Sequence, residues 1–129
     1  MKTDIHTLQD IHLLVDTFYG RIRKDSVLGP IFDNQIQERW PQHLETMCRF
    51  WQTVLLDEHT YQGSPFVPHA KLPVQESHFS HWINLFNQTV DELFEGTKAE
   101  RAKWQGARMA EMFWSKINYY TNQPAIPIL

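Results

Sequence analysis

Large apolar side chains recur at helical spacing in several separate stretches, and this pattern constrains the fold more than any other feature. Within residues 7–24, Ile11, Val15, Phe18 and Ile22 are spaced as i, i+4, i+7 and i+11, which places them on one face of a helix. No stretch alternates apolar and polar residues with a period of two over the length of a strand. The sequence therefore predicts an all-α fold.

Capping residues, glycines and prolines set the expected boundaries of the helices. Thr7 and Asp10 fit a capping box at the start of the first helix. Leu28-Gly29-Pro30 is expected to break that helix, and Gly96 is expected to separate the last two. The expected helical ranges, in chain order, are 7–24, 30–37, 41–57, 75–95 and 99–120.

The stretch from residue 57 to residue 73 interrupts this pattern. Its sequence, DEHTYQGSPFVPHAKLP, holds three prolines within nine residues, so no long helix can pass through it. A loop of this length inside a compact domain is uncommon and often functional. His69 lies among the prolines, which stiffen the backbone that would present its imidazole to a metal or cofactor. The alternative is an ordinary histidine of a surface loop.

Composition and charge exclude several classes of protein. The 129 residues, 42% hydrophobic and 21% charged, suit one globular domain over 1–129 with flexible termini at 1–6 and 121–129. The net charge of −3, without a basic stripe, disfavours nucleic-acid binding. No apolar run is long enough for a membrane span, and the first residues lack a signal pattern. A soluble, cytoplasmic protein is therefore expected.

The candidate functional groups are mainly the side chains of histidine, tyrosine and tryptophan residues. His43 adjoins an apolar stripe and could act as a rim residue or a gate. His78 and His81 are spaced i, i+3, which could hold one metal ion, although a surface pair is the simpler interpretation. The polar hydrogens of Tyr19 and Trp82 must be paired within the core or face a ligand. The single cysteine, Cys48, lies on an apolar helical face and is expected to be an inert buried thiol.

Four motifs, in their order and spacing, resemble those of the group III truncated haemoglobins. They are FYGRIRKDSVLGPIF (18–32), WPQHLETMCRFW (40–51), YQGSPFVPHAKLP (61–73) and HFSHWINLFNQTVDELFEG (78–96). The paired-glycine motifs of groups I and II are absent, which also fits group III. The resemblance covers residues 8–120 and implies a truncated, 2-on-2 helical globin fold that encloses haem b.

The resemblance also implies the residues of a haem site. His69 corresponds to the proximal histidine, whose imidazole binds the haem iron. On the distal side, Tyr19, Trp82 and a gating His43 correspond to the ligand-facing residues, with Phe18 beside the tyrosine. The cofactor contacts implied in addition to His43 and His69 are Phe32, Met47, Trp51, Phe79 and Phe86.

The resemblance implies that the protein binds O2, and also NO, CO, cyanide or peroxide, in oxygen transport or in the handling of nitric oxide and reactive oxygen. A peroxidase-like or nitric oxide dioxygenase side activity would need an external reductase, and a monomer is expected. Two alternatives remain open from the residues themselves. One is a non-haem metal protein ligated by His78, His81 and His43, and the other is a helical interaction module without a cofactor.

Overall fold

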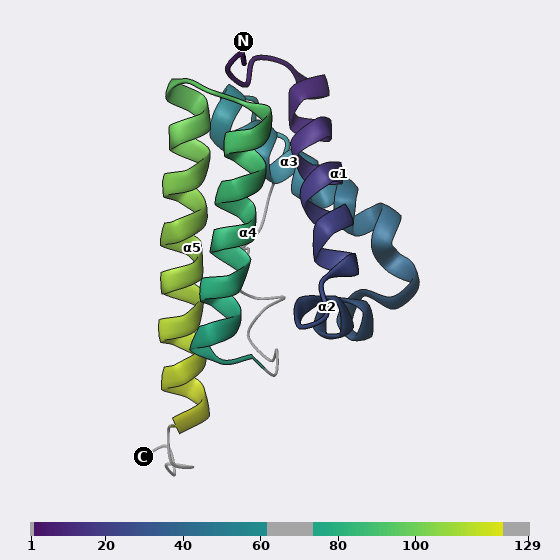
Figure 1. The fold of residues 1–129 in the computed structure, drawn as a ribbon, viewed down its shortest axis with the longest axis vertical. Coiled ribbons are helices and arrows are strands. Elements are labelled where there is room, and N and C mark those ends of the chain that lie inside the picture. Colours follow the sequence, from purple (N-terminus) through teal and green to yellow (C-terminus); the bar gives the residue numbers. More distant parts are fainter. Residues whose placement is uncertain (1, 62–73, 123–129) are drawn as a thin grey trace.

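The structure is a computed structural model that describes residues 2–61 and 74–122, with only the backbone course given for 120–122. Within these ranges every regular element is helical, which confirms the all-α prediction (Figure 1). The elements are α1 (Leu8–Lys24), α2 (Leu28–Ile36), the short 3-10 helix η1 (Gln37–Arg39), α3 (Trp40–Leu56), α4 (Glu76–Leu93) and α5 (Thr97–Asn122).

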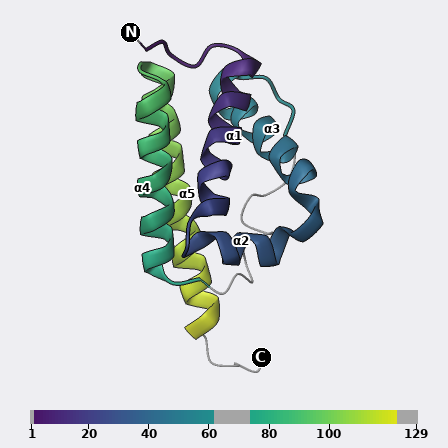
Figure 2. The same cartoon turned by 45° about the vertical axis from the view of Figure 1, so that its right-hand side comes forward.

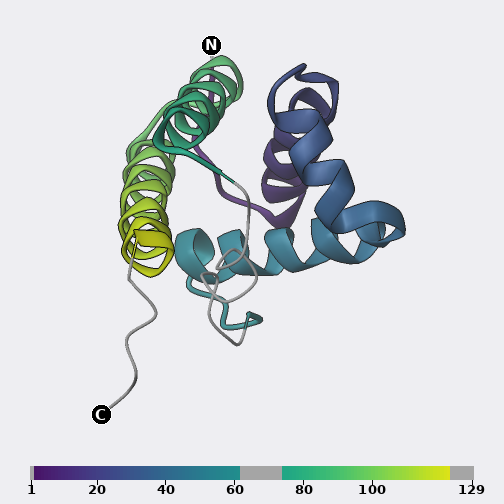
Figure 3. The ribbon, with the colours of Figure 1, turned by 90° about the horizontal axis from the view of Figure 1, so that it is seen from below.

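The helices form two pairs, α1 with α3 and α4 with α5. The second pair is antiparallel and joined by a short connection, as Figures 1 and 2 show. α1 contacts α2, α3 and α4, while α5 packs on α4 and α3. Figure 3 shows α3 lying crosswise to α4 and α5, with α5 beside one of its ends and α2 leading into the other. None of the helices in the described ranges combines the length and the apolar character needed to cross a membrane.

The first helix begins where its sequence predicts. The Thr7 hydroxyl oxygen accepts a hydrogen bond from the Asp10 N–H at 3.2 Å, and the Asp10 carboxylate accepts one from the Thr7 N–H at 3.0 Å. The apolar stripe that starts at Ile11 is buried along its whole length. Periodicity and capping therefore agree on this helix.

The expected break at Leu28-Gly29-Pro30 is wrong, because these residues form the first turn of α2. α1 ends at Lys24, and Asp25 turns the chain. One oxygen of the Asp25 carboxylate accepts hydrogen bonds from the N–H groups of Val27 and Leu28, each at 2.9 Å. Proline is tolerated in the first turn of a helix, since its missing N–H would be unpaired there anyway. The triplet therefore starts a helix instead of ending one.

Asp4 fastens the N-terminal segment to the start of α5. Its two carboxylate oxygens accept hydrogen bonds from the N–H groups of Lys98 and Ala99, each at 2.9 Å. Gly96, at φ +140°, leaves room for the carboxylate, because a Cβ atom there would lie 2.6 Å from the Asp4 carboxyl carbon. Burial raises the pKa of Asp4, but the backbone hydrogen bonds lower it by more, so its pKa lies below the ordinary value.

Asp4→Ala is expected to lower the free energy of unfolding by about 1 kcal/mol at pH 7, as losing a helix cap does. The pKa of Asp4 is depressed in the folded state, so its stabilisation is present above the ordinary value of 3.8 and is lost as the pH falls through the folded-state pKa. Urea unfolding at a series of pH values measures this difference. Asp4→Asn keeps one acceptor oxygen and should lose less, whereas equal midpoints for Asp4→Ala and wild type at pH 7 would contradict the role.

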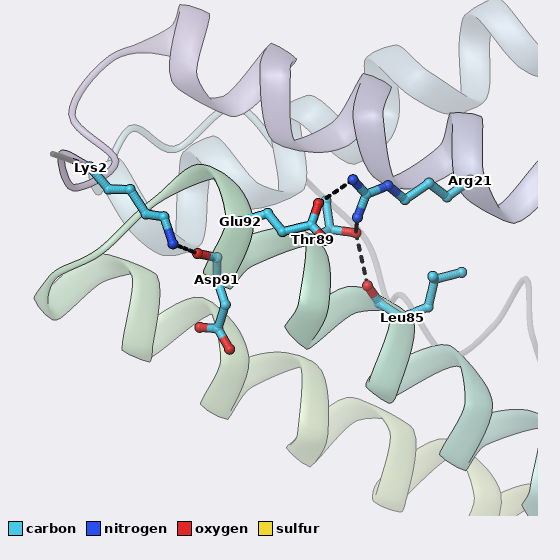
Figure 4. A network of polar contacts seen from close by, with 6 residues as sticks. All are labelled: Lys2, Arg21, Leu85, Thr89, Asp91 and Glu92. Atoms are coloured by element: carbon cyan, nitrogen blue, oxygen red, sulfur yellow. Dashed lines mark hydrogen bonds and ion pairs between the residues drawn. The ribbon is translucent and has the colours of Figure 1, made fainter.

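A polar network joins α1 to α4 (Figure 4). Arg21 donates through Nη1 to the Thr89 hydroxyl oxygen at 3.1 Å and pairs through Nη2 with Glu92. Thr89 is fully buried, and its hydroxyl donates to the Leu85 carbonyl oxygen at 2.8 Å. Since Arg21 follows Tyr19 by only two residues, this network helps to fix the position of Tyr19 relative to α4.

Candidate functional site

An apolar cavity lies between the two helix pairs. It encloses about 760 Å³ of space free of atoms, part of it open to solvent. Its lining is mostly apolar with a few polar groups, which is typical of small-molecule and cofactor sites. All five α-helices contribute side chains to its lining, together with Val74 from the connection before α4. The cavity is therefore the main candidate for a binding site in the described part of the chain.

Most of the predicted site residues meet at this cavity. They come from α1, α2, α3 and α4, so their sequence spacing alone does not bring them together. The predicted residues that line it are Phe18, Tyr19, Phe32, Met47, Trp51, Phe79 and Trp82. Their contacts with a cofactor stay predictions, but their convergence gives the haem expectation a physical location.

Three predicted residues are not part of this lining. His69 lies outside the described residues. Phe86 is 1% exposed and stands behind the wall, where its ring stacks on Trp82 with centroids 5.5 Å apart and planes 1° apart. Phe86 therefore supports the lining from the core. The third residue, His43, packs beside the cavity instead of facing it.

His43 belongs to an aromatic cluster around Tyr19. Its ring meets Tyr19 edge to face at 5.0 Å and Trp40 at 5.6 Å. Trp40 is held in turn, because its Nε1–H donates to Asp33 at 3.0 Å and the Arg23 guanidinium lies 4.6 Å from its ring centroid. His43 thus sits against the predicted distal tyrosine, and a gating role for it stays a prediction.

Tyr19 brings a hydrogen-bond donor to the cavity. The side chain is 5% exposed, and among the described residues nothing pairs with its hydroxyl. Burial, with a smaller effect from the Cys48 thiol, raises the pKa of Tyr19 far above its ordinary value of 10.0. The hydroxyl therefore stays protonated at neutral pH and can donate to a ligand.

Two indole groups also reach the lining. Trp82 meets Phe18 edge to face at 5.4 Å and stacks on Phe86, which fixes the plane of its ring. Trp51 stacks on Phe86 as well, with centroids 5.2 Å apart. Neither indole N–H is hydrogen-bonded to another residue of the described part. The Tyr19 hydroxyl and the two indoles are therefore hydrogen-bond donors in an otherwise largely apolar lining, as a site for a small polar ligand requires.

Some lining residues were not predicted as residues of the haem site. These are Leu28, Phe50, Val74, His78, Met109, Ala110 and Phe113. Ala110 and Phe113 lie on the apolar stripe that the sequence indicates for the last helix. Periodicity identifies such a stripe as buried, but it does not distinguish a side that faces a cavity from one that faces another helix.

The alternative of a non-haem metal centre is not supported. Within the described ranges, no three His, Cys, Asp or Glu side chains gather closely enough to hold a metal ion. His81 pairs through Nε2 with Asp25 at 2.6 Å, and His78 accepts a hydrogen bond at Nδ1 from the Gln75 N–H at 2.9 Å. These two histidines therefore serve separate contacts instead of sharing an ion with His43.

Cys48 is a buried thiol, as predicted. It is 3% exposed, and burial, with smaller effects from Asp16 and Glu45, raises its pKa to about 11. Its Sγ lies 3.3 Å from Nδ1 of His12. The protonated thiol is a poor nucleophile at neutral pH.

The residues present fit a haem group. Aromatic and aliphatic side chains make up nearly the whole lining, as a flat apolar macrocycle requires. The lining has only a few side chains with polar hydrogens, among them Tyr19 and Trp82. These can donate to a small polar ligand, while the rest of the lining does not bind water strongly. The connection that carries His69 runs from α3, which supplies Met47 and Trp51, to α4, which supplies Phe79 and Trp82.

Comparison with known proteins agrees with this geometry. The sequence model of the family described as Bacterial-like globin matches residues 4–114. The group 3 truncated hemoglobin ctb of Campylobacter jejuni is 35% identical over 98 residues, which cover 73% of this chain and 77% of that protein. The crystal structure of group III truncated hemoglobin from Campylobacter jejuni matches with a TM-score of 0.84 at 29% identity, covering 95% of this chain and 100% of the other.

These matches confirm the resemblance read from the four motifs and the truncated globin fold. They favour a haem-binding globin over a helical module without a cofactor. The chain therefore belongs to the bacterial-like globin family, among its group III truncated haemoglobins, whose cofactor is haem b.

Proposed function

We propose that the protein holds haem b in the cavity, with His69 as the proximal ligand, and that it binds O2 and other diatomic ligands there. The observation that carries the proposal is the presence of the Tyr19 hydroxyl and the Trp82 indole in an otherwise largely apolar lining. The role of His69 rests on its place in the third motif. When bound, haem supplies an iron with one coordination position open to a small ligand.

The side chains that line the cavity determine how strongly a ligand is held there. The apolar walls disfavour water. Tyr19 donates a hydrogen bond through a hydroxyl that burial keeps protonated, and Trp82 donates through an N–H whose direction is fixed by stacking on Phe86. Each such bond to a ligand carrying partial negative charge is worth about 1 to 3 kcal/mol. Both donors therefore slow the release of O2.

The proposed ligands are O2, NO and CO, together with cyanide and peroxide, and the proposed role is in oxygen transport or in nitric oxide and reactive oxygen handling. The same two donors would assist a peroxidase-like or nitric oxide dioxygenase side activity, with electrons from a separate reductase. We further propose that residues 1–129 form one domain and act as a monomer.

Titrating the protein freed of cofactor with hemin tests the proposal. Uptake should saturate at one hemin per chain, and tryptophan fluorescence should fall in parallel, because Trp51 and Trp82 line the cavity. A protein that takes up no hemin, or that binds it without saturation and without quenching, would contradict the proposed site.

His43→Ala is expected to change the rate at which CO enters by several-fold while leaving the rate at which it departs nearly unchanged. The reason is that His43 packs on Tyr19, 5.0 Å away, beside the cavity instead of in its lining. Rebinding of CO after flash photolysis measures entry. Gln42→Ala, an exposed change on the same helix, is the control. Equal entry rates in His43→Ala and wild type would argue against a gate.

A further inference from the structure

We infer that His78 holds a propionate carboxylate of the haem through its Nε2–H group. The inference rests on the proposed function, since it assumes haem in the cavity. His78 is half-buried in the first turn of α4, and it lines the cavity beside Val74. Besides Tyr19, Trp51 and Trp82, it is the lining residue whose side chain carries a nitrogen or oxygen atom.

A backbone hydrogen bond fixes which ring nitrogen of His78 carries the proton. Nδ1 lies 2.9 Å from the backbone nitrogen of Gln75 and accepts its N–H. A backbone N–H group can only donate, so Nδ1 carries no proton in this contact. The proton of the neutral ring is therefore on Nε2, which becomes a donor of known identity.

The partner of this donor must come from outside the described protein atoms. Nothing in the described ranges accepts a hydrogen bond from Nε2 of His78, although the ring lines the cavity. An occupant of the cavity that carries an acceptor would complete the contact. Haem b offers two propionate carboxylates, which are the strong acceptors at the edge of an otherwise apolar group.

The position of His78 suits a charged acceptor better than the positions of the buried donors Tyr19 and Trp51 do. Burying a carboxylate away from water is costly, so a propionate stays near the solvent-exposed part of a cavity. Tyr19 and Trp51 are buried, whereas His78 and Trp82 are partly exposed, and of these two His78 lies in the first turn of α4. The first turn of a helix also favours anions through its free N–H groups. Exposed Glu76 nearby opposes this attraction, but in water its effect is screened.

Two variants separate the donor from the helix cap. Glu and Gln are the usual residues at this third position of a capping box, and His78→Gln keeps both an acceptor for the Gln75 N–H and an N–H donor. His78→Glu also keeps the acceptor, but it has no donor and would repel a carboxylate. The two variants therefore differ in their interaction with the propionate, while both leave the helix cap in place.

The experiment measures the rate at which each loaded protein loses its cofactor to excess apomyoglobin. It uses haem b and, in parallel, haem b with both propionates converted to methyl esters. With haem b, His78→Glu should lose the cofactor about tenfold faster than wild type, the change expected for one lost hydrogen bond to a charged acceptor. His78→Gln should stay within about threefold of wild type. With the dimethyl ester, all three proteins should lose the cofactor at similar rates.

Equal rates of haem b loss for His78→Glu and wild type would overturn the inference. So would an equal acceleration with haem b and with its ester, because His78 would then shape the cavity without contacting a propionate. Failure of the wild-type protein to take up either cofactor would be a different result. It would overturn the proposed function, and this inference would fall with it.

Discussion

Replacing His69 with alanine is expected to abolish stable haem binding. In the motif PFVPHAKLP this histidine corresponds to the proximal ligand of the family, and neighbouring prolines restrict its backbone. Losing even an outer-shell partner of a metal ligand commonly weakens binding by about 10–100-fold, so losing the ligand itself should cost at least as much. The rate of haem transfer to apomyoglobin and the haem content after purification measure the loss.

Three histidines on the helices around the cavity already have other contacts and are not placed to substitute for His69. His43 is packed on Tyr19, His81 is paired with Asp25, and Nδ1 of His78 serves the cap of α4. Added imidazole should partly restore binding to His69→Ala by supplying the missing nitrogen ligand. His59→Ala removes an exposed histidine and should leave haem content unchanged. Normal haem retention in His69→Ala would show that the proximal ligand lies elsewhere.

Tyr19→Phe and Trp82→Phe are each expected to speed the release of O2 about tenfold or more. Each change removes one donor, and a hydrogen bond of about 1.4 kcal/mol corresponds to a tenfold change in rate. Phenylalanine at position 82 keeps an aromatic ring to stack on Phe86, so the wall should remain. Replacement of O2 by CO in a stopped-flow instrument measures the release.

Matched surface changes provide the controls for these rates. Tyr119→Phe removes a hydroxyl from a side chain that is 60% exposed, and Trp104→Phe removes an indole from one that is 54% exposed. Neither should alter O2 release. Because burial raises the pKa of Tyr19, its hydroxyl should remain a donor throughout the neutral and mildly alkaline range. Release rates in Tyr19→Phe and Trp82→Phe that match wild type would show that these donors do not reach the ligand.

The helices could be predicted from the sequence where local signals agree. At α1, the stripe beginning at Ile11 and the box formed by Thr7 and Asp10 mark the same helix, and the structure confirms it. At Leu28-Gly29-Pro30 the local signals are ambiguous, since a proline can end one helix or stand in the first turn of the next. The deciding contact is the Asp25 carboxylate, which accepts from two N–H groups as the chain enters α2.

The site could be predicted only in part, because helical spacing defines a buried face without saying what lies opposite. Trp82 and Phe86 share a face of α4, yet the first lines the cavity and the second stands behind it. The resemblance implied both as site residues, with Trp82 facing the ligand and Phe86 in contact with the cofactor. The role inferred for His78 depends on the hydrogen bond from Gln75, a local contact that residue type alone does not reveal.

A crystal structure of the haem-loaded protein would show directly where the haem lies and which residue binds its iron. Haem is expected in the cavity between the two helix pairs, with a bond from the iron to a ring nitrogen of His69 and with Tyr19 and Trp82 on the opposite face of the macrocycle. Iron bound by His43 or His78 in place of His69, or haem outside the cavity lined by Tyr19 and Trp82, would contradict this expectation.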